Sequence, residues 1–426
     1  MEKVLLVGVD IGGQNNFERS MQELEELAYS CEMEPVGVLT QRMDRFNSST
    51  YVGSGKVQEI KQYVQTLEAD VVVVNDDLTP SQIRNLVDEV DIPVVDRTGL
   101  ILDIFARRAQ TAESKLQVDV ARLKYLLPRL VGLRKYLGRQ SGTSGSMSNR
   151  GAGETKLELD RRKIERRIVM LQRELEDMEI QRASQRKQRL ASKIPQVALV
   201  GYTNAGKSTI MNRILALCGE RDDKLVYEED RLFATLDTSV RRIDSGDRNP
   251  FLLTDTVGFI HKLPHGLVVA FRSTLEEVKY ADLLVQVIDV SDADAKRCMD
   301  VTKRTLEELG AGTIPMLYCY NKCDKLPKEV APVQSDETGE TDCIYLSATD
   351  ESYDPDGIKK LLWKIKKMIY PPDEIAEYVI PYDQGKEVSY LRENVSVLSS
   401  EYREQGVFMC VSGDPKMLER LTAYKL

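Results

Sequence analysis

The hydrophobic positions of the first hundred residues follow two alternating periods. Short apolar runs predict strands at residues 4–9, 35–39, 70–74 and 92–95. Segments with helical spacing lie between them, at residues 17–29, 55–67 and 79–90. Strands that alternate with helices are typical of a small parallel sheet. Residues 1–105 are therefore expected to form an N-terminal α/β domain.

The next stretch changes to a heptad pattern. Apolar residues step by four and three along two seams, at Leu116, Val120, Leu123, Leu127 and Leu130, and at Ile164, Ile168, Leu171, Leu175 and Met178. Two such seams predict helices packed side by side. The segment between them, residues 138–153, is rich in glycine and serine. Residues 106–193 are thus expected to form an antiparallel helical hairpin with a Gly/Ser-rich tip loop, and a disordered linker is the alternative for the tip. Pro128 is expected to kink the first helix.

The remaining residues divide at a pair of prolines, 371 and 372. Residues 194–370 contain several buried-type apolar runs and are expected to form a mixed α/β domain. The run at 283–290 is interrupted by Gln286 and Asp289, so it predicts a sheet strand and not a membrane span. Residues 371–426 predict a strand near 378–381, a helix near 385–395 and a strand near 407–411. The last segment is therefore expected to be a small α+β domain.

A complete phosphate-loop motif, G-x-x-x-x-G-K-S, begins at Gly201. It follows an apolar run and precedes a helix-like segment, which is the context that the motif requires. Glycines let backbone N–H groups point at phosphate oxygens, and the helix adds its positive N-terminal end. We expect Lys207 to reach the β- and γ-phosphates and Ser208 to ligate Mg²⁺. The residues predicted to bind phosphate are Gly201, Tyr202, Thr203, Asn204, Ala205, Gly206, Lys207, Ser208 and Thr209.

An N-K-x-D motif at 321–324 follows the apolar run at 314–320 and predicts guanine specificity. The Asp324 carboxylate can accept hydrogen bonds from guanine N1–H and from the exocyclic amine, whereas adenine has no donor at either position. Asn321 is expected to brace the loop, and the Lys322 stem to cover one face of the base. Backbone groups at Ser347 and Ala348, at the end of another strand, are expected to donate to guanine O6. The motif therefore selects GTP over ATP.

A D-x-x-G element follows the apolar run at 251–253, with the residues Asp255, Thr256, Val257 and Gly258. We expect Asp255 to hold Mg²⁺ through a water and the Gly258 N–H to contact the γ-phosphate. The segment Phe233, Ala234, Thr235, Leu236 and Asp237 precedes it. Thr235 is the candidate that closes over Mg²⁺, with Thr238 and Thr254 as rivals. Loss of the γ-phosphate would release both segments.

The candidate catalytic residues are Lys207, Thr235 and Gly258. Phe259 stands where Ras-like switches carry a glutamine that orients the attacking water. Because Phe cannot polarise water, intrinsic hydrolysis is expected to be slow. We expect a partner surface or a rearranged backbone to complete the site, so that the target of the protein starts hydrolysis.

Charge distribution changes this picture. The 426 residues carry a net charge of −9, which by itself argues against nucleic-acid binding. The stretch from Arg107 to Lys193, however, holds 22 Lys and Arg against 10 Asp and Glu. A basic element on an acidic body fits a structured polyanion, and a solvated helical face is the alternative. Scattered cysteines, two histidines and no signal-peptide layout predict a cytosolic protein without a zinc site.

These motifs together resemble the HflX family of ribosome-associated GTPases. Segments outside the nucleotide motifs also carry the resemblance, at residues 53–57 (Gly-Ser-Gly-Lys-Val), 96–105 and 151–155. The family implies a G domain with an N-terminal α/β domain and a helical arm. It also implies a hydrophobic residue such as Phe259 in place of the catalytic glutamine, and weak ATP hydrolysis through the N-terminal region. The family's Gly-Pro-Gly-Glu turn is Gly-Ala-Gly-Glu here, at residues 151–154, and the tip loop is longer and serine-rich.

The resemblance further implies binding to the large ribosomal subunit, with the arm near the peptidyl-transferase centre, and splitting or rescue of stalled ribosomes. The expected protein is a Mg²⁺-dependent, monomeric GTPase that contacts rRNA through the basic arm. An ATP-driven rRNA-remodelling protein and a nucleotide-stabilised ribosome-binding module are the alternatives. The segment at 53–57 lacks the first glycine and the Ser of a phosphate loop, so a glycine turn that begins a helix is the favoured interpretation, with anion binding as the other.

Overall fold

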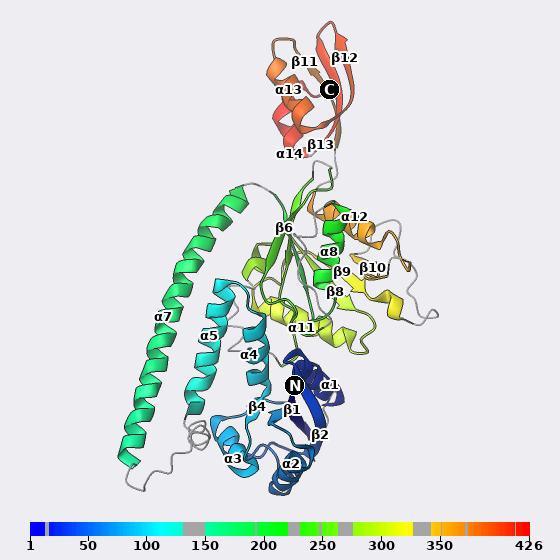
Figure 1. Cartoon of the computed structure of the whole chain (residues 1–426). Helices are drawn as coiled ribbons and strands as arrows, with labels where there is room; N and C mark the ends of the chain where they lie inside the picture. The colour runs from blue at the N-terminus through cyan, green and yellow to red at the C-terminus, as the bar shows by residue number, and fades with distance from the viewer. Residues whose placement is uncertain are drawn as a thin grey trace.

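The computed structural model describes residues 1–12, 17–130, 150–191, 194–219, 231–246, 249–262, 276–326, 342–350, 352–370, 374–413 and 415–426. Within these residues the strands form three sheets, and the helices pack on them or extend from them (Figure 1). Most of the predicted tip loop, residues 138–149, lies outside the described part of the chain. The α/β fold class predicted from the hydrophobic pattern is confirmed.

The N-terminal unit is a parallel sheet in the order β2-β1-β3-β4. Its elements are β1 (Glu2–Ile11), α1 (Phe17–Ser30), β2 (Met33–Met43), α2 (Ser54–Leu67), β3 (Val71–Val74), α3 (Pro80–Val90), β4 (Val94–Asp96) and α4 (Arg97–Arg108). Alternate residues of β1 enter opposite cores. Leu5 and Val7 pack with α2 and α3, whereas Val4 and Leu6 pack with α1 and α4. Helices therefore cover both faces of this sheet.

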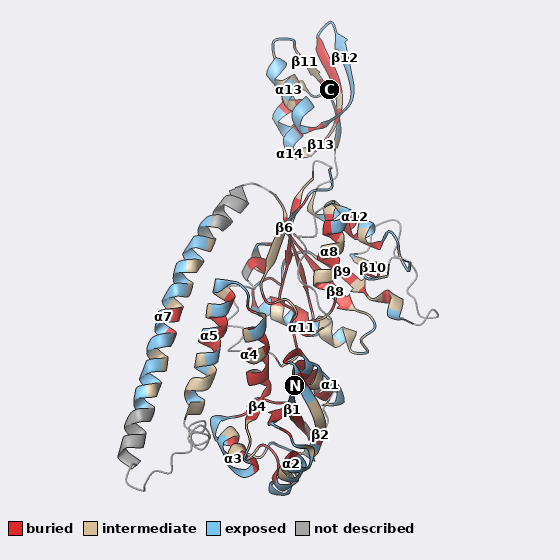
Figure 2. Ribbon diagram, in the orientation of Figure 1, coloured by how far each residue is buried: buried red, intermediate tan, exposed pale blue. Residues whose placement is uncertain are grey.

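Two helices form the arm beside the sheet units. They are α5 (Ala112–Leu126), which continues into a 3-10 turn η1 (Leu127–Arg129), and α7 (Arg150–Ala191). The two helices lie side by side, and much of the described surface of α7 faces solvent (Figure 2). Among the heptad positions, Val120, Ile168 and Leu171 are buried. The α-helical hydrogen bonding is interrupted after Leu126, where Pro128 lies in the 3-10 turn η1, and Leu130 is α-helical again.

The central sheet has the order β10-β9-β8-β5-β7-β6, in which only the β6–β7 pair is antiparallel among the described strands. Its elements are β5 (Gln196–Gly201), α8 (Lys207–Leu217), β6 (Ser239–Ile243), β7 (Phe251–Asp255), η3 (Glu276–Tyr280), β8 (Leu283–Asp289), α11 (Ala295–Glu308), β9 (Met316–Asn321), η4 (Cys323–Lys325), β10 (Cys343–Tyr345) and α12 (Gly357–Ile369). The carboxyl ends of β5, β7, β8 and β9 meet at one edge. The chemical motifs follow these strands, so the topology gathers them there.

The N-terminal and central units share one hydrophobic core. Phe105 of α4 packs edge-on against Phe233, with ring centroids 4.8 Å apart. Phe259 and Ile260 lie in the same cluster and are buried. Apolar side chains of the predicted nucleotide segments therefore hold the two units together.

The C-terminal unit is an antiparallel sheet in the order β11-β13-β12. Its elements are β11 (Glu374–Ile380), α13 (Gly385–Asn394), β12 (Ser396–Arg403), β13 (Gly406–Gly413), α14 (Pro415–Leu418) and η5 (Glu419–Tyr424). The hydrophobic pattern does not predict β12, because every residue of this edge strand is exposed and its sequence does not alternate. No helix among the described residues combines the length and apolar character needed to cross a bilayer.

Candidate functional site

The phosphate loop connects the end of β5 to the start of α8. Gly201 and Gly206 have φ angles of 144° and 96°, which L side chains rarely adopt. A Cβ on Gly206 would lie 2.3 Å from Asn321 Nδ2, so only glycine fits at this point. Asn321 Nδ2 donates to the Ala205 carbonyl at 2.9 Å, and its Oδ1 accepts from the Ala348 N–H at 3.0 Å. One side chain thus joins the phosphate loop to the segment after β10.

Lys207 is the first residue of α8 and is almost fully buried. Its Nζ donates to two carbonyls of its own loop, Tyr202 at 2.7 Å and Gly201 at 3.3 Å. Burial lowers the pKa of Lys207 to about 8, and the opposite charge of Asp255 limits this decrease. A phosphate in the loop would favour the charged form further, because anions stabilise a nearby ammonium group. The side chain is therefore suited to bind a polyanion.

The three predicted Mg²⁺ ligands lie together. Ser208 Oγ is 2.8 Å from Thr235 Oγ1 and donates to Asp255 Oδ2 at 2.6 Å. The second carboxylate oxygen, Asp255 Oδ1, is buried and accepts no hydrogen bond from the described residues. Burial raises the pKa of Asp255. Hydroxyl and carboxylate oxygens are the donors that Mg²⁺ prefers, so the residues fit this ion. Thr254 lies within β7, and Thr235 is the threonine that contacts Ser208.

Residues 231–237, here called the switch I segment, contact both the phosphate loop and the arm. The Phe233 N–H donates to Thr203 Oγ1 at 2.8 Å. The Asp237 carboxylate accepts from Thr111 Oγ1 at 2.6 Å and from the Gln110 N–H at 3.0 Å. Thr111 is the N-cap residue of α5. The segment that carries Thr235 is therefore hydrogen-bonded to the base of the arm.

Residues 255–262, here called the switch II segment, lie directly on the phosphate loop. The Phe259 N–H donates to the Gly201 carbonyl at 3.1 Å, and the Phe259 carbonyl accepts from the Thr203 N–H at 2.8 Å. A Cβ on Gly258 would lie 2.4 Å from Thr203 Cα. The Phe259 side chain points into the core shared by the two sheet units. The hydrophobic side chain thus packs between the two units, which gives a structural reason for a phenylalanine at this position.

The residues of the guanine motif lie at the other end of the phosphate loop. Lys322 Nζ donates to the Asn204 carbonyl at 2.9 Å and pairs with Asp289 Oδ2 at 2.8 Å. Although burial opposes it, hydrogen bonds from Lys322 and Ser291 lower the pKa of Asp289. Asp324 Oδ1 is buried and accepts no hydrogen bond within the described part of the chain. This oxygen is available for the N–H groups of a base. Sequence reasoning missed Asp289, although its position at the carboxyl end of β8 could have indicated it.

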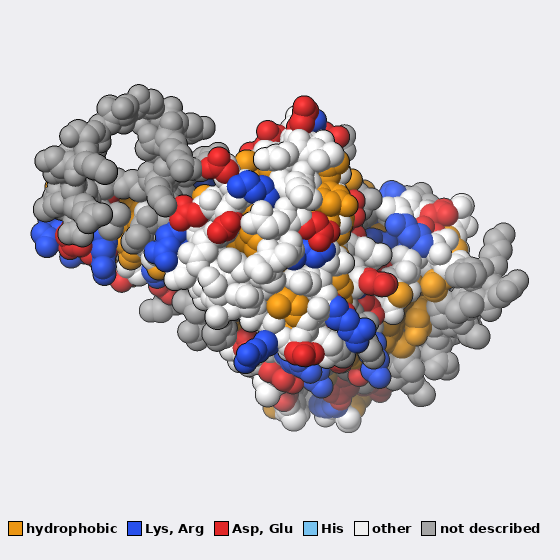
Figure 3. All heavy atoms as spheres, turned by 90° about the horizontal axis from the view of Figure 1, so that it is seen from below, with side chains coloured by type: hydrophobic (Ala, Val, Ile, Leu, Met, Phe, Trp, Pro, Cys, Tyr) orange, Lys and Arg blue, Asp and Glu red, His pale blue; other side chains and the backbone are white. Residues whose placement is uncertain are grey.

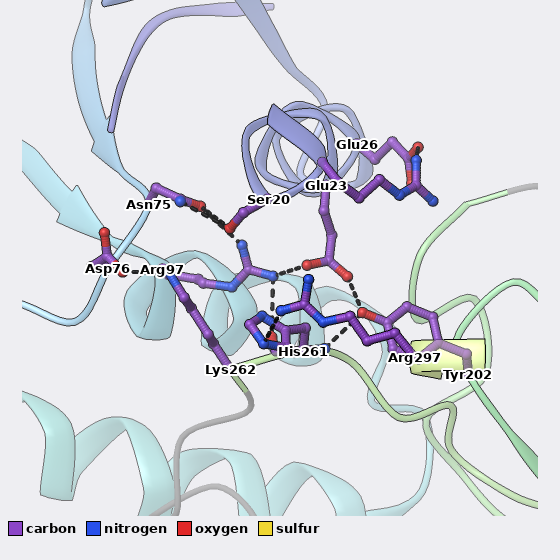
Figure 4. A network of polar contacts seen from close by, with 11 residues as sticks. Ser20, Glu23, Glu26, Asn75, Asp76, Arg97, Tyr202, His261, Lys262 and Arg297 are labelled. Carbon is purple, nitrogen blue, oxygen red and sulfur yellow. Dashed lines mark hydrogen bonds and ion pairs between the residues drawn. The ribbon is translucent and has the colours of Figure 1, made fainter. Parts of the chain in front are cut away.

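A second group of polar side chains joins the switch II segment to the N-terminal sheet (Figure 4). Arg97, 1% exposed, pairs with Glu23 and donates to the His261 carbonyl at 3.2 Å. The Tyr202 hydroxyl contacts Glu23 and accepts from the His261 N–H at 2.7 Å. Nothing in the sequence pattern predicts these contacts, because the residues lie far apart along the chain.

His261 makes stability depend on pH at this junction. Burial, with the charges of Arg297, Lys262 and Arg97, lowers its pKa to about 4, while Asp76 opposes the decrease. The unfolded chain binds the proton near pH 6.5, so the folded protein loses stability as pH falls from about 6.5 to 4. We expect a His261→Asn variant to show a shallower decrease in its urea midpoint between pH 7 and 4.5. The free energy of unfolding should change with pH by less than the full value for one proton, because the side chain is only half-buried. Parallel pH profiles for variant and wild type would contradict this assignment.

Three family models match consecutive parts of the chain. Family models described as "GTP-binding GTPase N-terminal", "GTP-binding GTPase Middle Region" and "50S ribosome-binding GTPase" match residues 18–106, 108–189 and 196–322. The chain is 44% identical over 420 residues to the GTPase HflX of Caldanaerobacter subterraneus subsp. tengcongensis, covering 99% of this chain and 93% of the relative. It is 43% identical over 387 residues to the GTPase HflX of Escherichia coli, covering 90% and 87%.

Among solved structures, the chain is similar to a GTP-binding protein from Sulfolobus solfataricus in complex with GDP. The identity is 24%, the TM-score is 0.44, and the match covers 87% of this chain and 99% of that one. The chain is also similar to the solved complex of SsGBP with GDP, with 25% identity and a TM-score of 0.47, over 86% of this chain and 100% of that one.

Proposed function

Because this chain belongs to the HflX family of GTPases, we propose that it binds the large ribosomal subunit in its GTP state. There it would act in ribosome splitting, rescue or biogenesis. GTP binding and hydrolysis are the activity of the family. The observation that carries the ribosomal part is the link between Asp237 and the N-cap of α5. Through it, the segment that carries Thr235 can influence the arm.

The nucleotide is proposed to bind with its phosphates in the loop from Gly201 to Thr209 and its base between Lys322, Asp324 and the Ser347–Ala348 backbone. Ser208, Thr235 and Asp255 would hold Mg²⁺, Asp255 through a water, for which its Oδ1 has no competing partner among the described residues. Bound Mg²⁺ supplies positive charge at the phosphate oxygens. Thr256 and Val257 directly precede Gly258 in the chain, and Phe233 and Ala234 directly precede Thr235. These residues are proposed to line the phosphate site.

Hydrolysis then depends on how the γ-phosphate is positioned and on how its negative charge is stabilised. Lys207 would stabilise negative charge on the transferred phosphoryl group, and the Gly258 N–H would orient the γ-phosphate. Phe259 offers no polar group, and its side chain is occupied in the shared core. We therefore propose a slow intrinsic rate that the ribosome raises by repositioning the switch II backbone.

The arm is the proposed rRNA-binding element. It would belong to a chain organised as an N-terminal domain (1–105), a helical hairpin (106–193), a G domain (194–370) and a C-terminal domain (371–426). Seen from below, Lys and Arg side chains lie on the arm with Asp and Glu side chains among them, and both signs are also interspersed over the rest of that face (Figure 3). Binding through phosphate contacts should weaken steeply as salt concentration rises.

GTP turnover is expected to rise by at least about tenfold when purified large ribosomal subunits are added, because a partner completes the site. Small subunits at the same concentration serve as the matched RNA-protein control and should leave the rate unchanged. The measurement is phosphate release at saturating GTP, repeated at two salt concentrations. Equal turnover with large subunits, small subunits and neither would contradict the proposal and would favour a ribosome-binding module that uses the nucleotide only for stability.

A further inference from the structure

The helix α12 has a charge opposite to that of the domain that carries it. Its 13 residues include five lysines and no aspartate or glutamate. Residues 194–370 as a whole hold 23 Lys and Arg against 29 Asp and Glu. A local basic element on an acidic body is typical of a surface that binds a polyanion. This element is separate in the sequence from the basic arm.

The helix packs on the side of the central sheet that faces away from the N-terminal unit (Figure 1). Val197 and Leu199 of β5 enter the core formed with α8 and α12. Ala198 and Val200 point to the other face of the sheet, into the core shared with the N-terminal unit. The N-terminal unit therefore leaves the outer surface of α12 accessible.

An exposed aromatic ring lies in the middle of this outer surface. Trp363 is the only tryptophan of the chain, and it is 53% exposed. Two pairs of lysines lie one helical turn before and one turn after it on the same side of the helix, namely Lys359 with Lys360 and Lys366 with Lys367. Seven residues separate the two pairs, which is about 10.5 Å along a helix. Lys367 Nζ lies 5.0 Å from the centroid of the indole ring.

The fifth lysine of the helix has a structural role, in contrast to these four. Lys364 is buried, and its Nζ donates to the Cys343 carbonyl at 2.7 Å. Lys366 contacts a neutral group, the Ser245 hydroxyl in the turn that follows β6. The requirements of the fold therefore account for Lys364 but not for the positive charge of the outer surface.

Two aspartates at the start of the helix partly offset this charge. Lys359 Nζ lies 2.8 Å from Asp356, and Lys360 Nζ lies 3.5 Å from Asp354. The lysine side chains are 61% and 44% exposed, and ion pairs at the surface contribute little. Both aspartates precede the first turn, where the helix dipole also favours their negative charge. A phosphate group can therefore replace them as the partner of the lysines.

The combination of ammonium groups and an exposed indole ring fits RNA better than a membrane surface. Lysines bind phosphates, and an aromatic ring stacks on an unpaired base. An interfacial helix instead inserts a broad apolar face among the lipids. The apolar side chains Leu361, Leu362 and Ile365 are buried in the protein core, so the outer surface offers only Trp363 and Met368.

We propose that the outer surface of α12 is a second RNA-binding site, in which Trp363 stacks on an unpaired base and the two flanking pairs of lysines bind the adjacent phosphates. The site belongs to the central unit, so it does not depend on RNA binding by the arm. Two linked sites bind one large RNA more tightly than either site alone, because the second contact forms within the complex.

The fluorescence of Trp363 tests this site in the full chain. Because the chain has one tryptophan, its emission reports on α12 alone. Titration with rRNA extracted from large ribosomal subunits is expected to quench the emission to a plateau, and added salt should reverse the quenching. Vesicles of phosphatidylserine and phosphatidylcholine, at matched phosphate concentration, should leave it unchanged. Unchanged emission with rRNA, or a response to the vesicles alone, would overturn the proposal.

Substitution of the ring separates stacking from a general loss of affinity. Trp363→Ala is expected to lower the affinity for the same rRNA by about 5- to 50-fold, as measured by filter binding. Trp363→Phe should retain most of the affinity, because a phenyl ring also stacks. Equal losses in both variants would overturn the proposal. Unchanged affinity of Trp363→Ala would do so as well, and would leave the role proposed for the arm intact.

Substitution of the lysines tests the phosphate contacts. The double variant Lys359→Gln/Lys367→Gln should reduce the slope of log affinity against log salt concentration by about 1 to 2, because two phosphate contacts are lost. The matched control is Lys303→Gln/Arg304→Gln, which removes two charges from the exposed surface of α11. The control should keep the wild-type slope, and all variants should bind GTP as wild type does. Equal changes of slope in the two double variants would contradict a site on α12.

Discussion

Asp324→Asn is expected to lower the affinity for GTP by at least about 100-fold, since two charge-assisted hydrogen bonds to the base are lost. Asp324 Oδ1 is buried without a hydrogen-bond partner among the described residues. The free-energy cost of removing this oxygen from water is therefore already present before the nucleotide binds. Guanine N1–H and the exocyclic amine would satisfy the carboxylate. In the variant, the NH₂ group of the asparagine faces one of the N–H groups of guanine, so two donors oppose each other in a buried site.

The same variant should gain affinity for a different nucleotide. Xanthine has a carbonyl in place of the exocyclic amine of guanine, and the asparagine NH₂ group can donate to it. We expect Asp324→Asn to bind xanthosine triphosphate more tightly than GTP, with the order reversed in wild type. Competition against a fluorescent nucleotide measures both. If the variant retained its preference for GTP, the assignment of Asp324 as the guanine acceptor would be wrong.

Lys207→Ala is expected to lower the rate of GTP hydrolysis by about 100- to 1,000-fold, because one preorganised charge at the phosphoryl group is removed. The effect is large because the ammonium group is buried, where electrostatic interactions are stronger than in water. Loss of Lys207 also leaves the carbonyls of Gly201 and Tyr202 without this donor. Single-turnover hydrolysis at saturating GTP separates the chemical step from binding.

Lys56→Ala is the matched control for this experiment. Lys56 lies in the Gly-Ser-Gly-Lys-Val segment that resembles a phosphate loop, but Gly53 there is the N-cap of α2 and Lys56 pairs with Glu59 at 2.8 Å. The structure thus gives this segment the role of a glycine turn that begins a helix. GTP turnover of Lys56→Ala should match wild type. A loss of similar size in both variants would show that the two segments share the reaction.

Local sequence patterns predict, for physical reasons, which of the candidate nucleotide-binding residues lie close together. A phosphate loop needs glycines at fixed positions, and parallel strands bring their carboxyl ends to one edge. Residues at the carboxyl ends of β5, β7 and β9 therefore had to meet, and Ser208 does lie against Asp255. Thr235 precedes β6, so its contact with Ser208 does not follow from this rule. The alternation of strands and helices likewise predicts the N-terminal sheet, because both of its faces are covered.

Contacts between distant segments could not be predicted in this way. Glu23 and Arg97 read as ordinary charged residues of helices, yet they form a buried pair beside Tyr202 and His261. In the sequence, Phe259 indicates only that the catalytic glutamine of Ras-like switches is absent, whereas in the structure its side chain belongs to a core shared by two units. A single sequence carries the periodicity of each element but not the way in which two finished units pack. The role of Asp237 at the base of the arm is hidden for the same reason.

Cosedimentation of the full chain with purified large ribosomal subunits tests the central proposal most directly. The protein is mixed with subunits in the presence of a non-hydrolysable GTP analogue, GDP or a non-hydrolysable ATP analogue, at one fixed salt concentration. We predict that it pellets with the subunits only with the GTP analogue, and that Asp324→Asn abolishes this retention. Equal retention with all three nucleotides would contradict the account.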